Sequence, residues 1–162
     1  MKPRFEAQRG GGFKLRLPAA ERDMLRSVPG QLRELLRGDL DAPELRRLFP
    51  PAYQDDAELQ EEYRRLTIDD LADRRREALQ VVEETVDADR LTEEQLNAWL
   101  GVVNDVRLVL GTRLDVTEDS YLRPPPQDDP RFAQFALFSY MGFLEENIVE
   151  ALASALPAAT DG

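Results

Sequence analysis

The segment from Trp99 to Leu114 constrains the fold more than any other part of the sequence, because it combines an apolar helical pattern with two arginines. At about 100° per residue, its leucines and valines gather on one side of a helix, and Arg107 and Arg113 fall within that apolar sector. Small and polar residues form the opposite strip, where a second helix can approach closely or solvent can enter: Gly101, Asn104, Asp105, Gly111 and Thr112. We therefore expect a central helix in which Trp99 and both arginines are structural.

Arg107 and Arg113 need carboxylate partners, because an unpaired guanidinium group in an apolar interior is strongly unfavourable. Three acidic residues are candidates: Asp56, Glu62 and Asp105. Asp105 is expected to point away from Arg107, so the two distant residues are favoured. We favour an internal ion-pair network that fixes the register of the helix. The functional alternative is an anion pocket lined by Arg107 and Arg113 together with Arg65 or Arg75.

The first 17 residues predict a β-hairpin. Arg4–Gln8 and Phe13–Leu17 flank Arg9 and three consecutive glycines, and glycine readily adopts the positive φ that a tight connection requires. The triple glycine lacks the lysine and the serine or threonine that end a phosphate-binding loop, so we expect no nucleotide there. We divide the chain into a hairpin arm (1–17), a helical domain (18–156) and a flexible tail (157–162).

Most of the remaining sequence follows a helical period. Thr92 and Gln95 form a capping box before the central helix, and Thr67 with Asp70 predicts the start of another helix. Pro29 must kink or split the first helix. Helices are expected over residues 18–37, 41–48, 55–66, 67–86, from about 93 to 114, and 130–156. The prediction is a mainly α, single-domain bundle of about six helices with a short N-terminal hairpin.

The residue types that the chain lacks exclude several functions. It contains no cysteine and no histidine, so it has no thiol switch, no thiolate nucleophile and no imidazole base or metal ligand. Oxidation of Met24 or Met141 is a chemically weaker route to redox sensing. No apolar run reaches the roughly 18 residues of a membrane span, and the N-terminus lacks the apolar core of a signal peptide. We expect a cytoplasmic protein without a cofactor.

Charge is distributed unevenly along the chain. Residues 1–47 carry a net charge of +4 and residues 48–162 carry −15, which together give the formal net charge of −11. An acidic body of this size repels the DNA polyanion, so we expect no autonomous DNA binding. Three basic residues of the hairpin could touch phosphate groups if a partner held the protein on DNA: Arg4, Arg9 and Lys14.

The last predicted helix carries more apolar surface than one core-facing stripe can use. A regular stripe includes Met141, Leu144 and Ile148, but aromatic residues spread around most of the circumference. Another helix of the same domain can cover this surplus. The functional alternative is a face for a second copy or for a partner protein, formed by three aromatic anchors: Phe132, Tyr140 and Phe143.

Two pairs of carboxylates keep one enzymatic hypothesis open. Glu58 and Glu61, followed by Glu84 and Asp87, reproduce the ExxE and ExxD spacing of the all-α nucleoside triphosphate pyrophosphohydrolases of the MazG type. Acidic residues at i and i+3 share a helix face, and four carboxylates from two helices can hold Mg²⁺ ions that activate water. The same spacing is also typical of a solvated helix face, which we favour.

Two stretches carry a resemblance to a known family. One contains Arg47–Pro50 with Ala52, Tyr53 and Asp56; the other contains Trp99, Asn104, Asp105, Arg107, Leu108 and Leu110–Leu114. With the acidic and arginine-rich residues between them, these stretches resemble an actinobacterial family of unknown function that includes the AosR-type oxidative-stress regulators. The resemblance implies a small cytoplasmic regulatory protein without a known catalytic activity.

On this resemblance we predict a non-enzymatic transcriptional regulator in an oxidative-stress response. It is expected to act through contacts with a sigma factor or RNA polymerase, with homodimerisation as a further option. The MazG-type pyrophosphohydrolase remains one alternative. A protease adaptor remains another, because an adaptor would share the acidic and aromatic contact surface.

Overall fold

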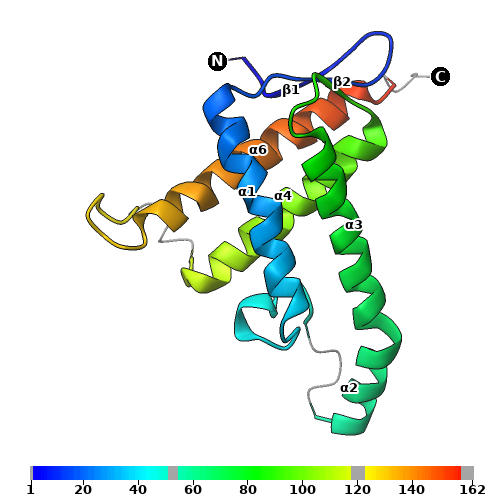
Figure 1. Ribbon diagram of the computed structural model, residues 1–162, viewed down its shortest axis with the longest axis vertical. Helices are drawn as coiled ribbons and strands as arrows, with labels where there is room; N and C mark the ends of the chain where they lie inside the picture. The colour runs from blue at the N-terminus through cyan, green and yellow to red at the C-terminus, as the bar shows by residue number, and fades with distance from the viewer. Residues whose placement is uncertain (1, 51–54, 118–122, 158–162) are drawn as a thin grey trace, which may run out of the picture.

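The computed structural model describes residues 2–50, 55–117 and 123–157 (Figure 1). Tyr53 of the family motif and residues 158–162 of the predicted tail lie outside these ranges. In chain order the elements are β1 (Phe5–Ala7), β2 (Phe13–Leu15), α1 (Ala19–Arg37), the 3-10 turn η1 (Pro43–Leu45), α2 (Ala57–Tyr63), the π-helical turn η2 (Arg64–Ile68), α3 (Asp69–Thr85), β3 (Arg90–Leu91), α4 (Glu93–Arg113) and α6 (Phe132–Ala155).

The mainly α prediction is confirmed, but the number of helices is wrong. In the described part of the chain there are four helical segments rather than about six, because α2, η2 and α3 follow one another without a break over residues 57–85. The hydroxyl of Thr67 does not cap a new helix; it donates to the carbonyl of Tyr63 within the run. Asp56 caps the run instead, accepting from the backbone N–H groups of Glu58 and Leu59. The helix predicted over 41–48 is only the 3-10 turn η1.

The first helix keeps its predicted length. α1 extends from Ala19 to Arg37 through Pro29, so the proline does not split it. Pro29 is buried on the same side as Leu25, Val28 and Leu32.

None of the helices in the described ranges combines the length and the apolar character that a membrane crossing requires.

The predicted hairpin is confirmed, and a third strand joins it. β1 and β2 are antiparallel with Phe5 opposite Leu15, and the connection between them places Gly11 at φ 95° and Gly12 at φ 75°. β3 pairs with the other edge of β2, with Leu91 opposite Phe13. A Cβ on Gly12 would lie 3.2 Å from the carbonyl oxygen of Leu91, so glycine is needed at this close approach as well as for the turn.

α4 occupies the centre of the fold, between α3 and α6 (Figure 1). Trp99 on α4 is buried, packs edge-to-face against Phe5 with ring centroids 5.7 Å apart, and donates from its indole nitrogen to the Thr85 hydroxyl at 2.8 Å. Phe13 and Leu15 of the hairpin belong to the same buried cluster. The hairpin is therefore built into the core of the helical domain.

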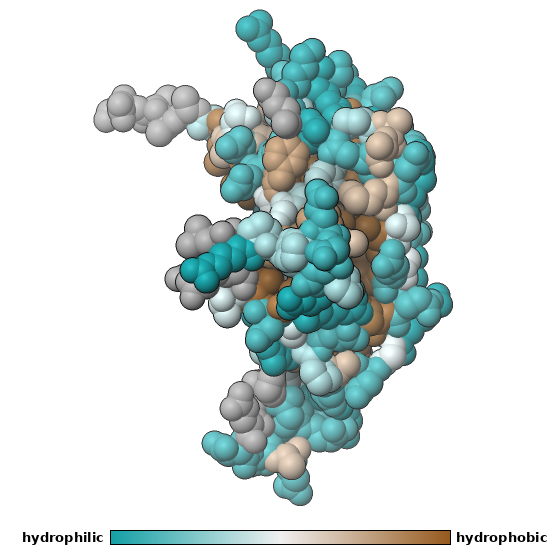
Figure 2. All heavy atoms as spheres, turned by 90° about the vertical axis from the view of Figure 1, so that its left-hand side faces the viewer, coloured by the Kyte–Doolittle hydropathy of each residue, from teal (hydrophilic) through white to brown (hydrophobic). Residues whose placement is uncertain are grey.

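The molecule is elongated, because the helical run over 57–85 extends beyond the elements that cover α3. Figure 1 shows α2 projecting from the end opposite the sheet. Figure 2 views the molecule from the side and shows most of the brown apolar surface in the middle and upper parts of this face; the lower end is mostly hydrophilic.

Candidate functional site

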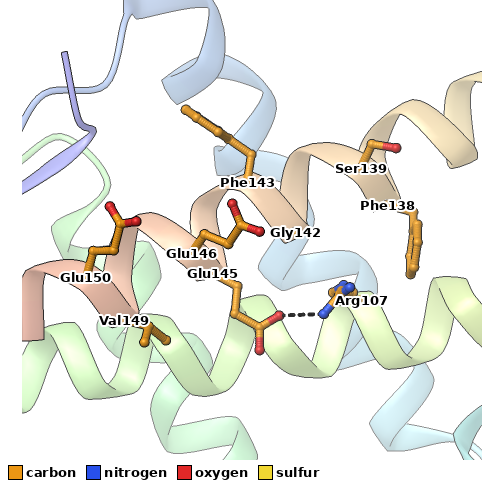
Figure 3. Close-up of a pocket in the computed structure, with 9 residues that line it drawn as sticks. All are labelled: Arg107, Phe138, Ser139, Gly142, Phe143, Glu145, Glu146, Val149 and Glu150. Atoms are coloured by element: carbon orange, nitrogen blue, oxygen red, sulfur yellow. Dashed lines mark hydrogen bonds and ion pairs between the residues drawn. The ribbon is translucent and has the colours of Figure 1, made fainter. Parts of the chain in front are cut away.

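The crossing of α4 and α6 is organised around Arg107. Nη1 of Arg107 donates to Oε2 of Glu145 on α6 at 3.0 Å, and the guanidinium group stacks over the ring of Phe138 at 5.4 Å from its centroid (Figure 3). Arg107 also lies directly against the backbone of α6, because a Cβ on Gly142 would be in van der Waals contact with its Nε at 3.6 Å. This set of contacts fixes the position of α6 against α4.

A cleft of about 810 Å³ opens along the outer surface of α6 beside this ion pair. Figure 3 shows Glu145 pointing towards Arg107, whereas Glu146 and Glu150 project from the other side of α6. The lining is apolar and acidic: Arg107, Phe138, Ser139, Gly142, Phe143, Glu145, Glu146, Val149 and Glu150. Its chemistry therefore suits an apolar group that carries positive charge.

The three aromatic residues predicted to contact a partner lie along α6 and are all half-buried. Tyr140 and Phe143 pack on the core with their ring centroids 6.2 Å apart, and Phe143 is also covered by the guanidinium group of Arg4 at 5.4 Å. The N-terminal hairpin segment therefore covers part of the apolar surface of α6 that does not face the core. The role of Phe132, Tyr140 and Phe143 in partner binding stays a prediction.

Arg4 links the hairpin to two helices. Its Nε pairs with Glu21 of α1 at 3.0 Å, and its backbone N–H donates to Oδ1 of Asn147 on α6 at 2.9 Å. Burial raises the pKa of the neighbouring Tyr140, and the carboxylate of Glu21 raises it further, so this hydroxyl keeps its proton. Arg4 is thus held in intramolecular contacts, whereas the other basic residues of the predicted phosphate-contacting set, Arg9 and Lys14, are exposed.

The predicted partners of the two arginines on α4 are wrong. Arg107 pairs with Glu145, and Arg113 pairs with Glu44 of η1 at 2.6 Å. Of the three expected partners, Asp56 caps α2 and Glu62 is exposed on the same helix, while Asp105 binds another arginine. The error arises because helical periodicity gives the direction of a side chain but does not identify the element that faces it.

Asp105 is the most buried carboxylate of the site and holds α3 against α4. Its two oxygens accept from Nη1 of Arg75 at 2.8 and 3.0 Å, and Nη2 of Arg75 donates to the carbonyl of Leu48 at 3.2 Å. Burial raises the pKa of Asp105 to about 6, and the nearby Arg75 opposes this increase. Asp105 and Gly111 are both buried, so at these two positions the strip of small and polar residues on α4 is covered by other elements and is not open to solvent.

The anion pocket, which was the functional alternative for Arg107 and Arg113, does not form. Arg107, Arg113 and Arg75 each bind a different carboxylate, and Arg65 is exposed on the distant η2 turn. The three ion pairs join α4 to α6, to η1 and to α3. They are separate pairs to three elements, and Arg113 is exposed, so the single internal network predicted from the sequence does not form.

The four carboxylates of the MazG-type hypothesis are not brought together. Glu58 and Glu61 lie on α2, whereas Glu84 lies at the far end of α3 and Asp87 follows that end by two residues. Because a helix rises about 1.5 Å per residue, the continuous run separates the two pairs by roughly 35 Å. Asp87 is bound by Arg26, and no cluster of acidic residues within the described ranges is arranged to hold a metal ion. The predicted pairing of these carboxylates in one metal site is therefore wrong.

A family comparison accounts for the chain as a whole. The profile of DUF2017, a domain of unknown function, matches residues 1–152. The chain belongs to the DUF2017 family.

The chain is similar to mycobacterial proteins. The oxidative stress regulator AosR of Mycobacterium tuberculosis is 31% identical over 125 residues, which are 66% of this chain and 56% of that protein. An AosR protein of Mycobacterium leprae is 32% identical over 127 residues, which are 68% of this chain and 58% of the relative. The aligned part thus spans just over half the length of these relatives. No solved structure matches the chain significantly.

One surface of this DUF2017 domain was not identified from the sequence. Leu59 and Leu66, which belong to the helix predicted over residues 55–66, are exposed by 44% and 70%. They lie on the projecting end of the run, among acidic residues. The sequence signal for this surface was present, as two leucines seven residues apart within an acidic stretch, but the pattern does not show whether the core reaches them.

Proposed function

We propose that this chain is a non-catalytic regulator of an oxidative-stress response that acts by binding another protein, with RNA polymerase or a sigma factor as the partner. The observation that carries the proposal is the similarity over about two thirds of the chain to proteins named oxidative stress regulator AosR, together with the DUF2017 match. A cytoplasmic location follows from such a partner.

The distribution of charged groups supports protein contact over catalysis or autonomous DNA binding. The acidic pairs of the enzymatic alternative lie at opposite ends of one helical run, and Arg4 and Arg16 of the basic hairpin are engaged by Glu21 and Glu6. The net charge of −11 repels nucleic acid. The same negative net charge attracts the basic surfaces of other proteins.

A genetic experiment tests the regulatory role. A strain that lacks the gene and its complemented counterpart are exposed to hydrogen peroxide, and their transcripts are sequenced. We expect a defined set of peroxide-responsive transcripts to change in the deletion strain and to return to normal on complementation. Identical peroxide responses in the two strains would contradict the proposal.

A biochemical experiment tests the absence of catalysis. The purified chain is heated with and without Mg²⁺, and the release of pyrophosphate from nucleoside triphosphates is measured. We expect no Mg²⁺-dependent stabilisation and no turnover, because a ligand stabilises only when it binds the folded state. Turnover that is lost in the Glu58→Gln and Glu84→Gln variants would restore the pyrophosphohydrolase hypothesis.

A further inference from the structure

The end of the helical run formed by residues 55–70, called the acidic end below, has almost no packing partner of its own. α2 has no buried residue, and its main packing partner among the described elements is η2, the next turn of the same run. Within the acidic end, Ile68 is the one described residue that is buried. The helix therefore continues beyond the core instead of covering it (Figure 1).

The acidic end carries apolar side chains on this uncovered surface. Leu59 and Leu66 are among the most exposed large hydrophobic residues of the described chain, at 44% and 70%. They are seven residues apart along the run, which includes the π-helical turn η2, and half-buried Tyr63 stands between them in the sequence. Two leucines at this spacing form the type of face that an amphipathic helix inserts into an apolar groove.

Carboxylates surround these leucines. The acidic end contains seven acidic residues and two arginines, a local net charge of −5. Arg64, one of the two arginines, is bound to Asp41 outside the acidic end. No ion pair of the described residues involves four of the exposed carboxylates: Glu58, Glu62, Asp69 and Asp70. The surface thus combines an apolar stripe with uncompensated negative charge.

This charge identifies the kind of partner. Two copies of the acidic end would repel each other across any shared interface, and nucleic acid or an anionic membrane would be repelled in the same way. An apolar groove on a partner protein can bury the leucines, and lysine and arginine residues at the edges of the groove can pair with the carboxylates. We propose that the acidic end is a docking helix, with Leu59 and Leu66 inserted into an apolar groove of a basic partner protein.

The helix is formed before it binds. Asp56 caps its first turn through two hydrogen bonds of 3.1 Å, and its last turn continues directly into α3, which is anchored in the core. A preformed helix loses less conformational entropy on binding than a segment that folds at that moment. The identity of the partner as RNA polymerase or a sigma factor rests on the proposed function; the location of the surface rests on the structure.

Direct binding to purified components tests this inference. The full chain is immobilised, and RNA polymerase core enzyme and each sigma factor of the source organism are passed over it at two salt concentrations. The Leu59→Ser/Leu66→Ser double variant is compared with Leu156→Ser, a control of the same residue type that is 70% exposed at the end of α6 and outside the cleft. Circular dichroism and urea unfolding check that both variants fold as the parent does.

We expect the double variant to weaken binding at least about tenfold and the Leu156→Ser control to leave it unchanged. A Glu58→Gln/Glu62→Gln variant should slow association and reduce its salt dependence. Equal affinity of parent and double variant would overturn the docking surface while leaving the regulatory function intact. No binding of the parent to any component would overturn both.

The oligomeric state provides an independent control. We expect sedimentation to show a monomer at low salt, where the charge of the acidic end opposes self-association. We also expect a monomer at high salt, where this repulsion is screened, because the proposed groove belongs to another protein. A dimer that forms at high salt and is lost in the double variant would identify a second copy as the occupant, and it would overturn the basic partner.

Discussion

Two parts of one continuous helical run behave differently in this protein. The α3 part buries Ala72, Leu79, Val82 and Thr85 against the core, while the α2 part buries no residue, although both parts carry leucines and many charges. The difference lies in what surrounds each part: α1 and α4 cover α3, and neither extends as far as α2. A helical pattern therefore predicts a helix in both parts, but only packing shows which leucines stabilise the fold.

The largest effect is expected where the run is fully packed. Leu79 on α3 has no exposed surface, so the Leu79→Ala variant should lower the free energy of unfolding by about 2–5 kcal/mol through lost burial and the cavity left behind. Urea unfolding followed by circular dichroism measures this change. A loss below about 1 kcal/mol, the usual scale of an average substitution, would mean that α3 is packed no better than α2.

The second prediction uses the ion pair that ties α3 to α4. Burial raises the pKa of Asp105 from 3.8 to about 6, so the folded protein binds a proton here more tightly than the unfolded chain does. The resulting stabilisation is fully present below about pH 4 and is lost as the pH rises through 6. Relative to Asp105→Asn, the parent should gain about 2 kcal/mol of unfolding free energy between pH 7 and pH 4. Unfolding free energies that change in parallel with pH would show that Asp105 is not buried as described.

A third prediction concerns Gly101 on α4, a helix position with free space for a larger side chain. A Cβ on Gly101 of α4 would meet no atom within 4 Å, so Gly101→Ala should raise the free energy of unfolding by about 0.5–1 kcal/mol through helix propensity. The matched control is Gly111→Ala, whose Cβ would lie 2.9 Å from Nη1 of Arg47 and 3.4 Å from the ring of Phe138. Gly111→Ala should raise the free energy of unfolding less than Gly101→Ala does. A larger increase for Gly111→Ala would mean that the contacts around Gly111 are looser than the structure shows.

The smallest effect on stability is expected at the acidic end. Leu66→Ser changes a side chain that is 70% exposed, so the free energy of unfolding should change by less than about 0.5 kcal/mol. The same urea measurement provides the comparison with Leu79→Ala. A large loss of stability would mean that Leu66 is covered in solution, and it would remove the basis for a docking role.

Local signals were predicted best. The glycine connection of the hairpin, the capping box of Thr92 and Gln95, and the buried position of Trp99 all depend on residues close in the chain or on a clear helical period. The cap at Thr67 failed because its hydroxyl has an alternative acceptor four residues earlier within a helix that continues. β3 was missed because two residues show no alternation, and its strand character depends on pairing with β2.

Contacts between distant residues could not be predicted in the same way. The partners of Arg107, Arg113 and Asp105 lie 38, 69 and 30 residues away along the chain. Several acidic residues fit each arginine equally well by charge, so composition cannot choose among them. The separation of the MazG-type carboxylates likewise depends on whether two helical patterns join into one run.

The sequence by itself determined the helical class, the N-terminal hairpin, the absence of thiol and imidazole chemistry, and the acidic character of the body, because these depend on residue type and local period. Only the tertiary structure decided which apolar and charged residues have partners. It enclosed Asp105 with Arg75, and it left Leu59 and Leu66 in solvent at the acidic end. The physical reason is that burial is a property of neighbouring elements, and the chain specifies those neighbours only when all of its helices pack together.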